Sequence, residues 1–141
     1  MKKFLNNKGY MLVEIILASV IAMGVGFFIT ELTIKLKNKN DDLIVKTQVH
    51  TDQSIIYNTI MKDIYDEPDK FDCKYVESIG TTGSNKFEYR DFVTYLSEYT
   101  KIDPNYITCQ KGDEGITIKI PISVPQLNEN FDVEIRTLAT S

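Results

Sequence analysis

The chain has 141 residues, which leaves room for one compact domain of modest size and excludes two large ones. Its formal net charge is −4 at pH 7, so bulk charge gives no attraction for nucleic acid, and any DNA contact would need a local basic patch. We find no nucleophile–base arrangement, phosphate-binding loop or redox motif, and we therefore expect neither an enzyme nor a cofactor-binding protein.

The first element is an apolar segment from Tyr10 to about Thr30, preceded by a short basic leader, residues 1–9. An apolar run of about 20 residues is what a helix needs to cross a hydrocarbon core of about 30 Å. The segment contains one charge, Glu14, and a carboxylate there costs on the order of 2.5–3.5 kcal/mol, so it should have a partner. Positive charges before the run favour a cytoplasmic amino terminus, and they are Lys2, Lys3 and Lys8. We expect a single-pass cell membrane protein with an extracytoplasmic C-terminal domain.

The residues at this junction resemble the type IV prepilin signal: a basic leader ending in Gly9, an aromatic residue, Tyr10, and then Glu14 five residues past the glycine. The resemblance implies that a prepilin peptidase cuts between Gly9 and Tyr10 and methylates the new amino terminus of Tyr10. Phe is the commonest residue at that position, and Tyr10 departs from it but remains aromatic. Three of the 16 basic residues precede the cut, which leaves 13 against 20 acidic residues, a formal charge of −7.

The same resemblance implies how the subunit assembles. Glu14 would pair with the freed amino terminus of a neighbouring subunit inside a bundle of stems, and Leu12 stands where the family usually has a large apolar residue. The partners implied are the prepilin peptidase, other pilin subunits and the inner assembly platform. The membrane would hold the subunit before assembly, and a cell surface filament would contain it afterwards.

Two ordinary interpretations compete with the prepilin signal. A secretory signal peptide has an apolar region of 7–15 residues that ends at small residues. The present run is longer, carries Glu14 near its start and lacks a clear Ala-x-Ala site after it. An uncleaved signal anchor explains the length and the orientation, but it leaves Glu14 unexplained. Gly24 and Gly26 within the run also have two interpretations, close helix packing through small residues or a weak point where the stem can unwind.

An amphipathic continuation is predicted over residues 31–67. Apolar residues recur there at spacings of four and seven, which marks one helix face, interrupted once at Asp52 or Gln53: they are Val45, Val49, Ile56, Ile60 and Ile64. No Pro or Gly lies between Gly26 and Pro68, so a single helix from Tyr10 to about Asp66, roughly 85 Å long, is expected. His50, the only histidine, is expected to be a solvated helix residue.

Residues 68–141 are predicted to form a globular α+β part that begins where Pro68 ends the helix. Residues 74–79 are read as a strand or a connecting segment, and residues 80–85 as a flexible turn. The apolar spacing over residues 91–99 favours a short second helix, and Asp103-Pro104-Asn105 indicates a turn.

The last third predicts antiparallel strands. Residues 106–110 and 116–124 form a hairpin around a turn at residues 111–115, and alternation resumes from Phe131 to Thr137. Pro121 argues for an edge position or an unpaired site in its strand. The expected fold class is α+β and pilin-like, a long N-terminal helix with a membrane-spanning first half, packed on a small antiparallel β-sheet of three or four strands.

Cys73 and Cys109 are expected to form a disulfide that closes a loop of about 36 residues, worth roughly 3–4 kcal/mol in the chain-entropy model; the alternative is two free thiols. No metal site is expected, since two cysteines without a nearby histidine do not complete a zinc shell. Calcium remains chemically open at the acidic run of Asp63, Asp66, Glu67, Asp69 and Asp72, which lacks a twelve-residue ligand pattern and is better explained as solvated charge.

The leading hypothesis is a structural subunit of a type IV pilus or related filament, with a minor pilin or pseudopilin favoured over a major pilin. One alternative is a single-pass, membrane-anchored extracellular binding module that never polymerises. Another is a competence pseudopilin that assists DNA uptake. Direct DNA binding would need exposed basic residues to cluster among abundant acidic ones, and the candidates are Lys70, Lys74, Lys86, Arg90 and Lys101.

Overall fold

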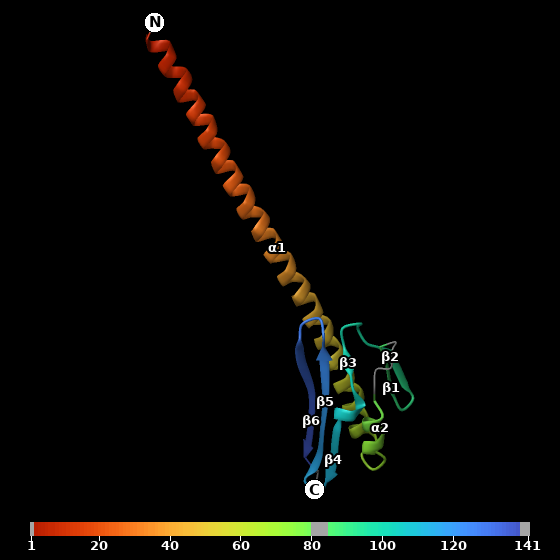
Figure 1. Cartoon of the computed structure of the whole chain (residues 1–141). Coiled ribbons are helices and arrows are strands. Elements are labelled where there is room, and N and C mark those ends of the chain that lie inside the picture. The colour runs from red at the N-terminus through yellow and green to blue at the C-terminus, as the bar shows by residue number, and fades with distance from the viewer. Residues whose placement is uncertain (1, 80–84, 139–141) are drawn as a thin grey trace. The chain divides into compact units, whose positions relative to one another are not determined.

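The computed structural model describes residues 2–79 and 85–138, with side chains from Gly9 onward. Figure 1 shows one long helix, α1 (Lys2–Asp66), followed by a short helix and small antiparallel sheets. The α+β fold class predicted from the sequence is confirmed. The chain divides between Asp41 and Asp42 into two compact units, which we call the stem unit and the head.

Helix α1 ends where the sequence predicts but begins earlier, at Lys2 instead of Tyr10. Residues 2–8 contain no proline, so the helix can extend through them at one backbone hydrogen bond per residue. Its end is set by Pro68, which cannot continue a helix, and the Glu67 amide makes a last helical bond to the Asp63 carbonyl, 3.1 Å. The predicted apolar face is buried in the head: Val45, Val49, Ile56, Ile60 and Ile64 are each at most 6% exposed.

Helix α2 (Cys73–Glu77) replaces the strand or connecting segment predicted at residues 74–79. Asp72 caps it, because its carboxylate accepts a hydrogen bond from the Lys74 amide at 3.0 Å. Val76 in α2 and Ile79 just after its C-cap are fully buried, which anchors this segment in the core. The predicted turn at residues 80–85 lies outside the described residues except for Asn85.

The short helix predicted over residues 91–99 is wrong. Strands β1 (Lys86–Tyr89) and β2 (Phe92–Tyr95) form an antiparallel hairpin instead, with Phe87 opposite Thr94 and Tyr89 opposite Phe92. The apolar spacing in this segment fits a helix or a strand, and pairing with β1 decides between them. The turn of the hairpin is Arg90-Asp91, and Arg90 has a φ of 51°, which is uncommon for a residue other than glycine.

The main sheet is built around β5 (Gly115–Val124). It pairs on one side with β6 (Glu129–Leu138), and on the other with β4 (Thr108–Gly112) and the two-residue β3 (Lys101–Ile102). A 3₁₀ turn, η1 (Pro104–Tyr106), lies between β3 and β4 where a turn was predicted. The predicted hairpin and the alternation after it are confirmed: Ile118, Ile120, Ile122, Val133 and Ile135 are buried.

Pro121 does not lie in an edge strand, since β5 is the central strand of the sheet. The alternative prediction, an unpaired site within the strand, agrees with the register. Pro121 lies opposite Asp132 on β6, but β4 pairs with β5 only as far as Lys119, and β3 begins its pairing at Ile122. A residue without an amide hydrogen is tolerated in a central strand because its second edge is open at that point.

Candidate functional site

Gly9 and Tyr10, the expected cleavage site, lie within α1, and both are exposed. A Cβ atom placed on Gly9 would meet nothing within 4 Å, so packing within the chain gives no reason for a glycine there. Tyr10 is 79% exposed, so the described residues cover little of its side chain. The contacts that the structure describes therefore do not explain the residue types at this junction.

Glu14 lies on α1 and is exposed. Its helical neighbours three and four residues away are Tyr10, Met11, Leu17 and Ala18, which offer no cationic side chain. Among the side chains that the structure describes, Glu14 has neither a hydrogen bond nor an ion pair. Within an apolar helix, this carboxylate is the group that most needs an external partner.

Leu12, 63% exposed, belongs to an apolar surface that continues along the stem unit. Every large apolar side chain from Tyr10 to Leu36 is at least 48% exposed in the single subunit. A contiguous apolar surface of this kind indicates a membrane or a protein partner. By length and composition, α1 is also the one helix among the described residues that could cross a membrane.

Gly24 and Gly26 leave α1 unbroken, and a Cβ on either glycine would meet nothing within 4 Å in the single subunit. The Gly26 carbonyl also accepts a hydrogen bond from the Thr30 hydroxyl at 2.9 Å. Neither glycine is required by contacts within this chain. Both interpretations from the sequence, close packing against a neighbour and local unwinding, remain predictions about the assembled state.

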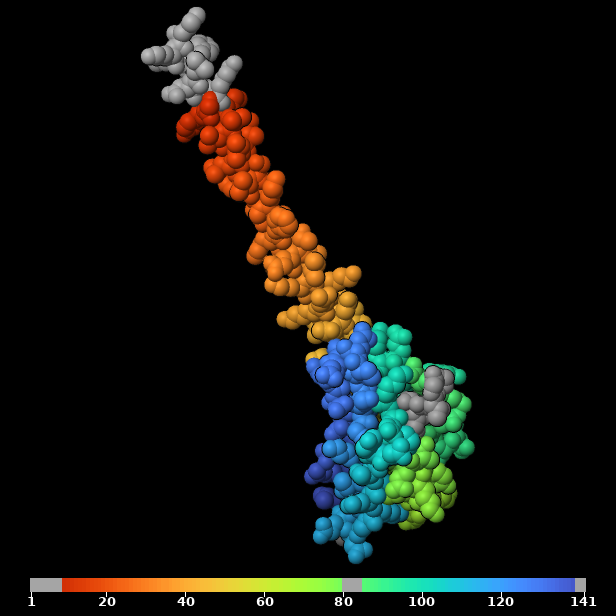
Figure 2. All heavy atoms as spheres, in the orientation of Figure 1, coloured from red at the N-terminus to blue at the C-terminus, as the bar shows by residue number. Residues whose placement is uncertain are grey.

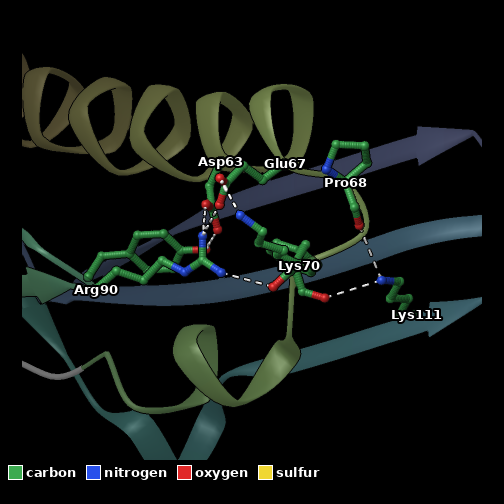
Figure 3. A network of polar contacts seen from close by, with 8 residues as sticks. Asp63, Glu67, Pro68, Lys70, Arg90 and Lys111 are labelled. Carbon is green, nitrogen blue, oxygen red and sulfur yellow. Dashed lines mark hydrogen bonds and ion pairs between the residues drawn. The ribbon is translucent and has the colours of Figure 1, made fainter.

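A polar clamp holds the segment that follows α1, and Figure 3 labels Asp63, Lys70 and Arg90 among its members. The Arg90 guanidinium pairs with Asp63, donates to the Lys70 carbonyl at 2.8 Å, and stacks 4.6 Å from the centre of the Tyr75 ring. The Tyr89 hydroxyl donates to the other oxygen of Asp63 at 2.6 Å. One hairpin, β1–β2, therefore binds both the last turns of the helix and the loop after it.

Lys111 completes the clamp from β4. Its ammonium donates to the Phe71 carbonyl at 3.1 Å and to the Pro68 carbonyl at 3.3 Å (Figure 3). Next to it, Cys73 and Cys109 form the expected disulfide, with a Cα–Cα distance of 5.5 Å, so α2 is bonded covalently to β4. The last turn of α1 contains no basic residue of its own; Arg90 comes from the turn of the β1–β2 hairpin and Lys111 from β4.

Two pKa values in this clamp depart from their ordinary range. The Lys70 ammonium, which bonds to Glu67 at 2.9 Å, lowers the pKa of that carboxyl. Burial, together with the hydrogen bond to Asp63, raises the pKa of the Tyr89 phenol well above 10.0. The first shift follows from ion pairing and the second from burial and hydrogen bonding.

The acidic run does not gather into a metal site among the described residues: no group of three or more His, Cys, Asp or Glu side chains there is placed to hold an ion. Asp63 and Glu67 are paired with cations, and Asp72 caps α2.

Three of the candidate DNA-binding cations are engaged with acidic side chains, since Lys70 bonds to Glu67, Lys86 to Glu88 and Arg90 to Asp63.

His50 is exposed, as expected, and its ring lies beside Gln53 and edge-on to Phe131.

The sequence did not reveal the role of Asp52, which is 5% exposed and accepts hydrogen bonds from Ser97 and Thr100. Its position in the apolar face of α1 was the available signal. The role of Arg90 in the clamp was also missed, because the residue was read as a surface cation.

Comparisons with models of protein families, with curated proteins and with solved structures each found no match. The geometry of the chain itself therefore carries the functional argument.

Proposed function

We propose that this chain is a type IV pilin-like subunit, a minor pilin or pseudopilin, that is cut after Gly9 and assembles through α1. One observation carries the proposal: a basic leader and Gly9 are followed by an exposed apolar helical segment, residues 10–30, whose lone carboxylate, Glu14, has no partner among the described side chains. A plain membrane anchor needs the apolar length but not the carboxylate.

Cleavage would supply the missing partner. A cut after Gly9 makes Tyr10 the first residue of α1, with a positive amine at the end of the helix that also carries positive partial charge. Opposite charges attract strongly in a low-dielectric bundle of stems, where neither would be stable alone. The exposed apolar side chains of the stem unit would exchange lipid for neighbouring stems, so the same surface serves storage in the membrane and assembly.

The proposed partners and location follow from this role. The prepilin peptidase, other subunits and the inner assembly platform are the proposed partners, and the head is proposed to be extracytoplasmic and displayed on a cell surface filament. The folded head, with its disulfide and buried core, suits such a location, because disulfides persist in oxidising surroundings.

Replacing Glu14 by Ala or Gln tests the proposal in cells that express the subunit with its assembly machinery. We expect both variants to be cut normally but to be lost from sheared surface filaments, while the membrane pool stays unchanged or rises. Glu31→Ala is the matched control, since Glu31 is also exposed on α1 but pairs with Lys35 of the same helix at 3.3 Å. Full incorporation of Glu14→Ala would instead favour the anchored binding module.

A further inference from the structure

A cleft lies on the face of the head sheet that points away from α1. It occupies the place where β3 and β4 leave part of β5 unpaired, next to Pro121, and its volume is about 640 Å³. Ligand pockets have volumes of roughly 300–1,000 Å³. In the orientation of Figure 2 the strands of the head cover most of its part of α1, so the view is from the side of this sheet face.

An exposed aromatic ring lines the cleft. Tyr106 is 68% exposed and ends the turn η1, and its amide donates to the Asp103 carbonyl at 3.2 Å. The Asp103 carboxylate holds the same turn by accepting from the Asn105 amide at 3.0 Å and from its side-chain nitrogen at 2.8 Å. The Tyr106 hydroxyl has no hydrogen-bond partner among the described residues. The ring is thus exposed on a hydrogen-bonded turn, and the partly buried Pro121 lines the same cleft.

The polar lining is balanced in charge. Lys101 and Lys119 contribute two positive charges, and Asp103 and Asp132 two negative ones. Lys119 and Asp132 pair across the strands at 2.9 Å, and Lys101 donates to Asn85 at 2.6 Å. Ser123 and Asn130 add groups that both donate and accept. An anion would meet two carboxylates and a cation two ammonium groups, so the lining favours an uncharged ligand rich in hydroxyls.

We propose that this cleft binds an uncharged saccharide. The C–H face of a sugar ring packs on a flat aromatic or proline ring, and its hydroxyls need donors and acceptors side by side, which is the combination found here. The proposal goes beyond filament assembly and does not depend on it, because the cleft lies wholly within the head. The expected binding is weak, since the cleft is shallow and its ion pair is already formed.

Saturation-transfer and ¹⁵N-shift NMR on the full chain tests this, in micelles of a detergent without a sugar head group. The probes are the β-1,4-linked trisaccharides of glucose and of N-acetylglucosamine, each at about 10 mM, which is ten times a millimolar Kd. We expect saturation transfer to at least one probe, with shifts of the Ile122 and Ser123 amides. Raising NaCl from about 50 to about 500 mM should leave the affinity unchanged, because the ligand is uncharged.

Two variants and one control decide the assignment. Tyr106→Ala removes the aromatic ring, and Ser123→Phe fills the floor of the cleft. Each should lower the affinity for the saccharide by about tenfold or more. Tyr95→Ala should have no effect, since Tyr95 is equally exposed, at 69%, but lies on β2 outside the cleft. Unchanged head resonances in the variants show that they are folded. Absence of binding to both probes, binding that survives both variants, or self-association through the cleft would overturn the proposal.

Discussion

Asp52 on α1 accepts two hydrogen bonds from Ser97, one from the backbone amide at 2.9 Å and one from the hydroxyl at 2.6 Å. The same carboxylate oxygen accepts a third from the Thr100 hydroxyl at 2.5 Å. Asp52 and Thr100 are both buried, and the three bonds join the helix to the segment between β2 and β3. A charged group inside the apolar face of α1 is tolerated because these donors replace its water.

Asp52→Leu should therefore destabilise the head although it makes the apolar face continuous. Three donors would lose their acceptor, and we expect the free energy of unfolding to fall by about 2–4 kcal/mol. Asp52→Asn keeps an acceptor oxygen and should cost about half as much. Urea unfolding of the full chain in micelles, followed by the near-UV circular dichroism of its tyrosines, measures both. Asp66→Asn is the exposed control, and a stabilised Asp52→Leu would contradict the assignment.

Arg90 combines an unusual backbone conformation with the clamp, and two substitutions separate these effects. Arg90→Ala loses the guanidinium contacts and keeps a φ of 51°, and we expect a loss of about 2–3 kcal/mol. Arg90→Gly loses the same contacts but accepts this φ freely, so it should be about 1 kcal/mol less destabilising than Arg90→Ala. The same unfolding assay measures the difference. Equal stability of Arg90→Ala and the unmodified chain would show that the guanidinium contacts contribute nothing.

The raised pKa of Tyr89 predicts that the head loses stability at alkaline pH. Its pKa is raised in the folded head, so the folded state holds the phenol proton more tightly than the unfolded state does. This contribution is fully present below pH 10 and is lost as the pH rises from there towards the raised folded pKa. Between pH 9 and about 11 the unmodified chain should lose stability faster than Tyr89→Phe. Parallel slopes for the two chains would contradict the shift.

Reducing the Cys73–Cys109 disulfide should lower the free energy of unfolding by about 3–4 kcal/mol, because a loop of 36 residues gains conformational freedom in the unfolded chain. Thiol alkylation and mass spectrometry establish the redox state, and urea unfolding with and without reductant measures the effect. The double variant Cys73→Ser, Cys109→Ser should be insensitive to reductant. If it responds as the native chain does, the stabilisation has another source.

The sequence predicts those parts of the fold where a single periodicity runs long. Five apolar residues from Val45 to Ile64 repeat often enough to define α1, and the alternation from Ile116 to Thr137 defines β5 and β6. Shorter segments are ambiguous. Residues 92–95 fit either a helix or a strand, and only their pairing with residues 86–89 makes them β2.

The candidate sites also differ in how far the sequence alone predicts them. Gly9, Tyr10 and Glu14 form a local pattern that can be recognised without tertiary structure. The clamp cannot be, because Arg90 reaches Asp63 across 27 residues and Lys111 reaches Phe71 across 40. Asp52 is only partly predictable from the sequence. Its place in an apolar helix face indicates burial, but it does not identify Ser97 as the hydrogen-bond partner.

The most direct test of the central claim is the intact mass of the membrane-extracted chain, expressed with and without a prepilin peptidase. A pilin-like subunit should lose residues 1–9 only when the peptidase is active, and its new terminus at Tyr10 should carry one added methyl group. Gly9→Leu, which removes the proposed cleavage residue, should keep the full-length mass in both strains. A full-length mass for the unmodified chain in the presence of active peptidase would contradict the proposal and favour a permanently anchored protein.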